Sequence, residues 1–394
     1  MTADRMQTAD VLCRGDLFVA RRSGRFLLVE LTAPHRVVST SVQCGGERDD
    51  LSFLVNHQSC EATGDAARYE RIAGLGPVGY HEQVCAEMGV APDRTAVMGT
   101  AANMAYAAHR AADFEGLRVD AFVTAGVAGN AARAGDPAGW TEAADGRWRR
   151  VETVGADAAD DATAPPAGTI NTILLLNHPV TPAAQARAVV TMTEAKSAAL
   201  AELAAPSRYS PTIATGTGTD QFCVAAPLDP QRVPKTATGP HVKLGELIGS
   251  AVLAAVKEAL RWQNGLEPSL TRGLFHALGR FGLTERRALA RLAELLPAEQ
   301  YALLDRNRKA VFWEPGVAAA AYAYAAVLDR TAFGTLPAGM ARETLRQQAA
   351  CLACALAAGP LEWPAFRAAL GDAPDDPVEL ALHALAAGWS AKWT

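Results

Sequence analysis

Seven residues near the middle of the chain, Ala214-Thr-Gly-Thr-Gly-Thr-Asp220, combine three hydroxyls, two glycines and a carboxylate. Glycine lets a backbone approach a bound molecule closely, and a positioned carboxylate can act as a general base. Two interpretations follow from these residue types. The stretch is either a flexible turn or a backbone cradle for a bound group, with side chains beside it that can do chemistry.

Two other stretches carry acid–base groups. Glu194 and Lys196 stand two residues apart on an expected helix, so they do not share a face, and the alternative is an exposed pair. Pro240 marks a helix start, which places His241 and Lys243 in the first turn. Free N–H groups there favour negative charge, and a histidine can serve as general acid or base. The alternative for this stretch is a surface turn.

Strands and helices of the first two thirds of the chain must position these groups. Runs rich in β-branched and apolar residues predict strands, and apolar residues at helical spacing predict helices. The strands are expected at 25–32, 35–42, 51–56, 95–102, 119–126, 169–177 and 221–227, and the helices at 76–90 (short), 182–205 and 239–265.

The strand pattern ends near residue 265, and alanine-rich helical segments separated by Pro and Gly follow. We therefore predict an α+β domain over residues 1–265, with a mixed, mostly antiparallel sheet packed with helices, and an all-helical appendage over 266–394. The polar, acidic stretch 141–168 is expected to be an exposed excursion without a core of its own.

Composition limits the class of protein. The chain has 394 residues, 49% of them hydrophobic and 20% charged, with a net charge of −5, which argues against a nucleic-acid partner. The longest apolar run, 317–328, is too short to span a membrane. Seven scattered cysteines and a polar, acidic N-terminus indicate a cytoplasmic protein with free thiols.

Three ordered stretches resemble the adenosylcobinamide amidohydrolase (CbiZ) family. They are TAGVAGNAARAGD (124–136), GTINTILLLNHPVTPAAQARAVVTMTEAKSAAL (168–200), and ATGTGTDQFCVAA followed by TGPHVKLGELI (214–248). The resemblance covers roughly residues 35–265 and leaves the helical appendage outside. It implies hydrolysis of the amide that joins a corrin-ring propionyl group to aminopropanol, giving adenosylcobyric acid for corrinoid salvage and cobalamin synthesis.

That reaction needs a nucleophile, polarisation of the carbonyl and a proton for the departing amine. Water activated by Asp220 or Glu194 is the favoured nucleophile, because sequence spacing fixes no base beside Thr217 or Thr219. His241 would protonate the amine. Lys196 or Lys243 would stabilise the oxyanion, together with backbone N–H groups of the turn at Gly216 and Gly218.

A corrinoid is large and fringed by amides, so its pocket should combine apolar surface with a few amide-pairing groups. Asn56, Asn130 and Asn171 suit that work, with Gly216, Thr217, Gly218, Thr219 and Lys243 as further substrate-binding candidates. The sequence indicates no required cofactor and no metal-ligand residues, and the corrinoid substrate carries cobalt of its own. The appendage is expected to form a homodimer or to cover the corrinoid. A non-catalytic corrinoid carrier or sensor, or a hydrolase of another amide, is the alternative function.

Overall fold

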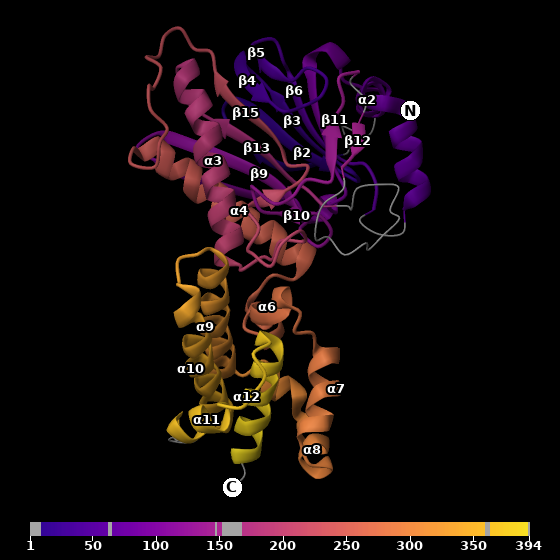
Figure 1. Cartoon of the computed structure of the whole chain (residues 1–394). Helices are drawn as coiled ribbons and strands as arrows, with labels where there is room; N and C mark the ends of the chain where they lie inside the picture. The colour runs from indigo at the N-terminus through magenta and orange to yellow at the C-terminus, as the bar shows by residue number, and fades with distance from the viewer. Residues whose placement is uncertain (1–8, 62–64, 146–147, 152–167, 359–362, 393–394) are drawn as a thin grey trace. The chain divides into compact units, whose positions relative to one another are not determined.

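The computed structural model describes residues 9–61, 65–145, 148–151, 168–358 and 363–392, and the chain folds into two compact units, residues 1–266 and 267–394 (Figure 1). Most of the acidic stretch 141–168 lies outside the described residues. Its described part includes a short hairpin of β11 (Trp140–Glu142) and β12 (Trp148–Arg150).

The first unit contains two large sheets whose strands are mostly antiparallel. Only two neighbouring pairs, β6 with β7 and β13 with β15, run parallel among the described strands. The five-stranded sheet has the order β1 (Asp10–Arg14), β2 (Phe18–Ser23), β3 (Phe26–Leu31), β6 (Phe53–Gln58), β7 (Thr95–Thr100). The six-stranded sheet has the order β5 (Gly46–Arg48), β4 (His35–Ser39), β15 (Gln221–Pro227), β13 (Ile170–Leu176), β9 (Leu117–Ala125), β8 (Ala108–Phe114).

The two sheets pack face to face. Leu27 and Val29 of the first sheet share one apolar cluster with Ile173 and Leu175 of the second. Because successive strand residues point to opposite faces, Leu174 of the same strand faces a different cluster on the other side. Burial on both faces explains why β13 is a continuous apolar run rather than an alternating one.

Helices cover the outer faces of both sheets. Helices α3 (Pro182–Glu202) and α4 (Lys243–Asn264) pack on the six-stranded sheet, and α2 (Ala66–Met88) packs on the five-stranded one (Figure 1). The first unit therefore has four layers in the order helix, sheet, sheet, helix. This architecture confirms the predicted α+β class with a mixed, mostly antiparallel sheet.

Helix α2 differs from its prediction. The sequence predicts a short helix over 76–90, and α2 contains that helix as its second part, but α2 begins earlier, at Ala66, and runs for 23 residues. Its backbone leaves helical geometry at Gly76 (φ 65°, ψ 175°), just before Pro77. Gly76 and Pro77 are typical of a boundary, so the sequence predicts only the part that follows them and misses the part before them, which begins at Ala66.

The second unit consists entirely of helices within its described residues, which confirms the predicted helical region. They pack around an apolar cluster that includes Trp389, Tyr324 and Phe312. No single described helix is long and apolar enough to cross a membrane, although α8 (Ala298–Phe312) and α9 (Pro315–Ala332), a sharply bent pair, meet that test together. The helices are α5 (Pro268–Thr271), α6 (Leu274–Leu278), α7 (Glu285–Leu295), α8 (Ala298–Phe312), α9 (Pro315–Ala332), α10 (Ala338–Ala357), α11 (Trp363–Ala369) and α12 (Pro377–Ala391), with the 3-10 helices η1 (Pro92–Arg94) and η2 (Met104–Tyr106) in the first unit and η3 (Gly279–Phe281) in the second.

Candidate active site

The stretch Ala214–Asp220 is an ordered turn held at the start of β15. Its strand β14 (Gly216–Thr217) pairs antiparallel with β10 (Ala131–Ala132), which follows β9. The turn then leads into Gln221, the first residue of β15, which pairs with Asn171 on β13. Three segments far apart in sequence therefore meet at this end of the six-stranded sheet.

Asp220 is the centre of this arrangement. Its Oδ1 accepts hydrogen bonds from Thr217 Oγ1 at 2.6 Å and from the backbone N of Ile170 at 2.9 Å. Its Oδ2 accepts from the backbone N of Thr217 at 3.1 Å and forms an ion pair with Lys196 Nζ of α3. The Asp220 and Lys196 side chains are only 17% and 16% exposed, so their charges interact with little solvent between them. A hydroxyl, a carboxylate and an ammonium are thus aligned in one place.

Gly216 makes this alignment possible through its missing side chain. A Cβ at this position would lie 2.5 Å from Asp220 Oδ2 and 2.8 Å from Lys196 Nζ. Its φ is not in the left-handed region, so close approach is the reason for glycine here. The glycine serves the ion pair rather than the flexibility of the turn.

Gly216→Ala is expected to force Asp220 and Lys196 apart. We expect a loss of about 1–3 kcal/mol in the free energy of unfolding, the usual cost of an inserted methyl group in a packed place. Any amide hydrolysis that depends on this ion pair should fall together with the stability. Urea unfolding and turnover measured on the same preparation check this, and Gly249→Ala is the control because a Cβ there meets nothing within 4 Å.

The backbone N–H groups of the turn are already used inside the protein. Thr217 N bonds to Asp220, Gly218 N to the carbonyl of Asn130 at 3.3 Å, and Thr219 N to Thr217 Oγ1 at 3.3 Å. The N–H group of Gly218 is therefore engaged, and its expected part in binding a carbonyl is not supported by this geometry. Lys196 remains as a donor, because an ammonium carries three N–H bonds.

Asn130 ties the turn to its surroundings. Its Nδ2 donates to the carbonyl of Gly168 at 3.1 Å and to Thr219 Oγ1 at 3.3 Å, while its Oδ1 accepts from Tyr209 Oη at 2.8 Å. It is 4% exposed. Thr169 Oγ1 donates to the carbonyl of Thr219 at 2.7 Å. The turn is thus held rigidly, as a catalytic group requires.

Asn56 and Asn171 lie between the two sheets, almost fully buried. Asn171 Nδ2 donates to Asn56 Oδ1 and to the carbonyl of Gly99, both at 2.9 Å, and Asn56 Nδ2 donates to Thr124 Oγ1 at 2.8 Å. The two side-chain amides find their hydrogen-bond partners inside the protein, as buried polar groups generally do. They link the sheets and do not reach a bound molecule, which corrects their proposed place in substrate binding.

Lys243 is held at the other end of the six-stranded sheet. Its Nζ lies 4.6 Å from the centre of the Phe114 ring, and Phe114 pairs with Leu117 at the start of β9. Asn171, beside the candidate site, pairs with Thr124 near the end of the same strand. Seven residues of extended strand (124 − 117) separate the two ends, which is about 24 Å. Lys243 therefore cannot act on the same amide as the turn.

His241 and Glu194 are also separated from the turn. His241 is an exposed residue two positions before Lys243, at the far end of the sheet, so its expected role as proton donor is corrected on the same ground. Glu194 is 53% exposed and faces Arg187, with 3.7 Å between the charged atoms. It stands on a different face of α3 from Lys196, as its spacing predicts.

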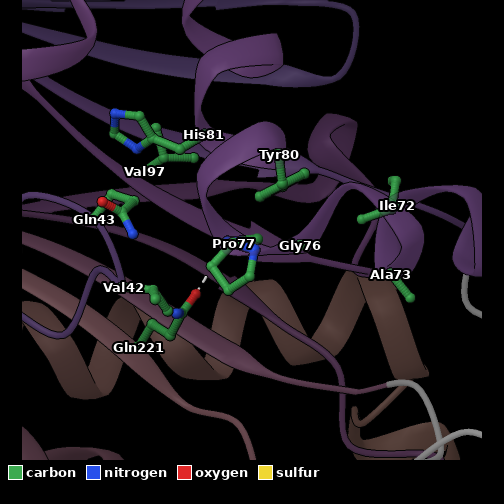
Figure 2. A pocket seen from close by; sticks show the side chains of 11 residues that line it. Val42, Gln43, Ile72, Ala73, Gly76, Pro77, Tyr80, His81, Val97 and Gln221 are labelled. Carbon is green, nitrogen blue, oxygen red and sulfur yellow. Dashed lines mark hydrogen bonds between the residues drawn. The ribbon is translucent and has the colours of Figure 1, made fainter.

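Gln221, which follows Asp220, lines a pocket of about 280 Å³ (Figure 2). Its Oε1 accepts from the backbone N of Gly99 at 3.0 Å. The pocket lies between β7 and the kinked part of α2, with Tyr80 and Pro77 on the helix side. The carboxylate faces α3 and Gln221 faces β7, so the pocket and the ion pair flank the start of β15.

His57 and Tyr80 form a neutral pair beside this pocket. Burial lowers the pKa of His57 to about 3, with the positive charges of Arg68 and Arg25 acting in the same direction. Burial also raises the pKa of Tyr80. His57 Nδ1 lies 2.8 Å from Tyr80 Oη, and its ring stacks on Phe26. The pair adds no charge to the pocket at neutral pH.

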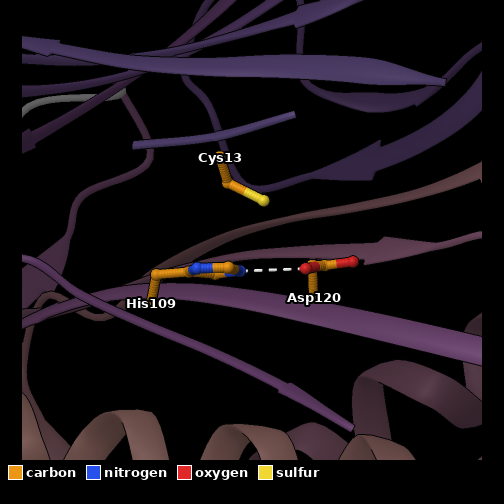
Figure 3. A group of neighbouring side chains, drawn as sticks. All are labelled: Cys13, His109 and Asp120. Carbon is orange, nitrogen blue, oxygen red and sulfur yellow. Dashed lines mark hydrogen bonds and ion pairs between the residues drawn. The ribbon is translucent and has the colours of Figure 1, made fainter. Parts of the chain in front are cut away.

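One group of described side chains has the donor types of a metal site: Cys13, His109 and Asp120, whose ligand atoms lie within 4.8 Å of one another (Figure 3). Asp120 already accepts from His109 Nε2 at 2.9 Å and from Arg118 Nε and Nη2 at 2.8 Å. Burial would raise the pKa of Asp120, but these bonds outweigh burial and hold it below its usual value. Burial, reinforced by Asp120, raises the pKa of Cys13. A metal ion would have to displace Arg118, so we interpret the group as an ion network.

Sequence reasoning missed three residues of the candidate site. Thr169 and Tyr209 hold the turn, and Gln221 joins it to the pocket. Position 221 could have been found, because it follows Asp220 at the start of a predicted strand and must point away from it. Tyr209 had no such signal, since its contact with Asn130 spans 79 residues.

Comparisons with known proteins match this first unit. A family model described as adenosylcobinamide amidohydrolase matches residues 12–268. An uncharacterized protein of Methanocaldococcus jannaschii is 36% identical over 189 residues, which cover 48% of this chain and 71% of that protein. A crystal structure of a Pyrococcus horikoshii protein covers 64% of this chain and 82% of its own, at 11% identity and a TM-score of 0.28, which is too low to carry an argument.

Proposed function

The chain belongs to the adenosylcobinamide amidohydrolase family, and from that premise we propose that it hydrolyses the amide between the corrin-ring propionyl group and aminopropanol of adenosylcobinamide. The products are adenosylcobyric acid and aminopropanol, and the acid can re-enter cobalamin synthesis in corrinoid salvage. The observation that carries this proposal is the alignment of Thr217, Asp220 and Lys196, because amide hydrolysis needs a nucleophile, a base and a cation at one carbonyl.

The geometry changes the preferred nucleophile. Sequence spacing alone favours water as the nucleophile, but in the structure Asp220 Oδ1 lies 2.6 Å from Thr217 Oγ1. We therefore propose that Thr217 Oγ1 attacks the amide carbonyl while its proton passes to Asp220. The oxyanion of the tetrahedral intermediate is stabilised by Lys196.

Collapse of that intermediate breaks the C–N bond. The proton held by Asp220 passes to the departing nitrogen, so aminopropanol leaves as a neutral amine and the corrinoid acyl group stays on Thr217 as an ester. Asp220 then takes a proton from water, which attacks the ester and releases adenosylcobyric acid. The proton returns to Thr217 Oγ1, and the site is restored. The cobalt of the corrinoid is part of the substrate and takes no part in these steps.

A non-catalytic corrinoid carrier or sensor would present the same fold and pocket. Incubation of the full chain with adenosylcobinamide, followed by mass spectrometry, separates the two. We expect release of aminopropanol together with adenosylcobyric acid, in many turnovers per protein molecule. Intact adenosylcobinamide held in a one-to-one complex would contradict the enzyme and support the carrier. The same assay on small amides and on complete cobamides defines which amide is cleaved.

The cell compartment proposed for this reaction is the cytoplasm. All seven cysteines are free thiols, as expected for a protein kept in a reducing environment. The proposed partner is the corrinoid alone, with no nucleic acid. For the helical unit we propose a part in homodimer formation, which sedimentation of the full chain tests.

A further inference from the structure

The middle of α2 exposes an apolar surface. Residues 72–79, Ile-Ala-Gly-Leu-Gly-Pro-Val-Gly, contain no polar side chain. Leu75 and Val78 are 39% and 54% exposed, and Val42, from the loop after β4, is 69% exposed. Most exposed helix surface in soluble proteins is charged, so an exposed apolar patch indicates a contact surface.

The pocket of Figure 2 opens beside this surface. Ile72, Ala73, Gly76 and Pro77 line it from the kinked helix. The backbone leaves helical geometry at Gly76, which separates the residues before it from the regular helical turns around Tyr80. The patch and the pocket together form one apolar surface with a hollow in it.

The hollow offers side-chain amides, and its lining includes one titratable imidazole, that of His81. Gln221 Oε1 accepts from the backbone N of Gly99, which fixes the amide and leaves its Nε2 as a donor toward the pocket. The side-chain amide of Gln43, also in the lining, bonds to no other described residue. No Asp, Glu, Lys or Arg lines the pocket among the described residues, and the neighbouring His57–Tyr80 pair is neutral. His81 also lines the pocket, but it is buried and its Nε2 donates to the carbonyl of Pro92 at 2.9 Å. Such a lining suits a neutral amide and disfavours a carboxylate or phosphate.

We propose that this pocket binds a primary-amide side arm of the corrinoid, with the apolar part of the ring against Leu75, Val78 and Val42. A primary amide offers donors and an acceptor, and it can pair with the amides of Gln43 and Gln221. A volume of about 280 Å³ accommodates one arm but not the ring. This inference rests on the proposed function and names the part of the protein that holds its substrate.

The position of Gln221 connects the pocket to the reaction. Gln221 and Asp220 are consecutive, so their Cα atoms are about 3.8 Å apart. Polar contacts also join the pocket lining to the turn. The carbonyl of Gly99 accepts from Asn171, and the one hydroxyl proton of Thr169 is shared between the carbonyl of Thr219 at 2.7 Å and Asn171 Oδ1 at 3.3 Å. An arm held in the pocket therefore places the ring at the edge where the ion pair lies.

The test is equilibrium dialysis of the full chain against adenosylcobinamide, with the corrinoid on each side identified by chromatography. Ala73→Trp puts a large side chain into the pocket from an exposed helix position, and we expect at least about tenfold weaker binding. Gln43→Leu keeps the size of the side chain and removes its amide, with about fivefold weaker binding expected. Ala186→Trp, on an exposed position of α3, is the matched control and should bind within about twofold of the unaltered chain.

The outcomes separate this inference from the proposed function. Suppose that the unaltered chain binds and hydrolyses adenosylcobinamide, and that Ala73→Trp and Gln43→Leu bind it as tightly as Ala186→Trp does. The proposed role of the pocket is then wrong, and the proposed function is supported. If Ala73→Trp and Gln43→Leu weaken the binding of adenosylcobinamide but the unaltered chain does not hydrolyse it, the proposed function is wrong and the proposed binding pocket is supported. If the unaltered chain binds no corrinoid, both are overturned. Thermal unfolding of each variant excludes loss of fold as the cause.

Discussion

Asp220→Asn is expected to lower the turnover of adenosylcobinamide about a hundredfold or more, because an amide cannot take the proton of Thr217 or of water. That loss corresponds to about 2.7 kcal/mol of transition-state stabilisation. The substituted side chain also keeps only one acceptor oxygen for the groups that Asp220 now binds, and it leaves Lys196 without its counter-charge. Turnover is measured by mass spectrometry of released aminopropanol, and the melting temperature of each protein is recorded with it.

Glu194→Gln is the matched control for this substitution. Glu194 is the other candidate base, and it lies on α3 two residues from Lys196, but it is exposed and only faces Arg187. An exposed ion pair contributes little, so we expect turnover within about twofold of the unaltered chain. Near-normal turnover of Asp220→Asn, or a large loss in Glu194→Gln, would remove Asp220 from the centre of the mechanism.

Much of the fold could be predicted from the sequence because its core elements have strong local patterns. The apolar run Ile170–Leu176, the alanine-rich Pro182–Glu202 and the amphipathic Lys243–Asn264 form the strand and helices expected of them. In α2 only the part after Gly76 and Pro77 was predicted, because these two residues are typical of a boundary, whereas the helix extends before them to Ala66.

The candidate site could be predicted only where neighbours in sequence are neighbours in space. Thr217 and Asp220 are three residues apart in one turn, so their contact follows from local geometry. Lys196 reaches Asp220 across 24 residues and was found through family resemblance rather than spacing. His241 belongs to the same ordered set of motifs, yet it lies at the other end of the sheet, because motif order along a chain does not determine which end of a strand a loop occupies.

Thr217 distinguishes the two possible nucleophiles, and its replacement should have the other large effect. If Thr217 Oγ1 attacks the carbonyl, Thr217→Ala removes the nucleophile and lowers turnover about a hundredfold or more, whereas Thr217→Ser keeps a hydroxyl beside Asp220 and retains turnover within about tenfold. If water attacks, Thr217→Ala loses only one hydrogen bond to Asp220, and turnover falls about fivefold.

A covalent intermediate provides a second, independent readout of the same question. Acid quenching during turnover should trap the ester on Thr217, detected as a corrinoid acyl group on the peptide that contains this residue. Thr217→Ser should carry the same adduct, and Thr217→Ala should carry none. A fully active Thr217→Ala protein without adduct would assign the attack to water, with Asp220 as its base. The proposed function would then survive, since the carboxylate and Lys196 serve either nucleophile at the same carbonyl.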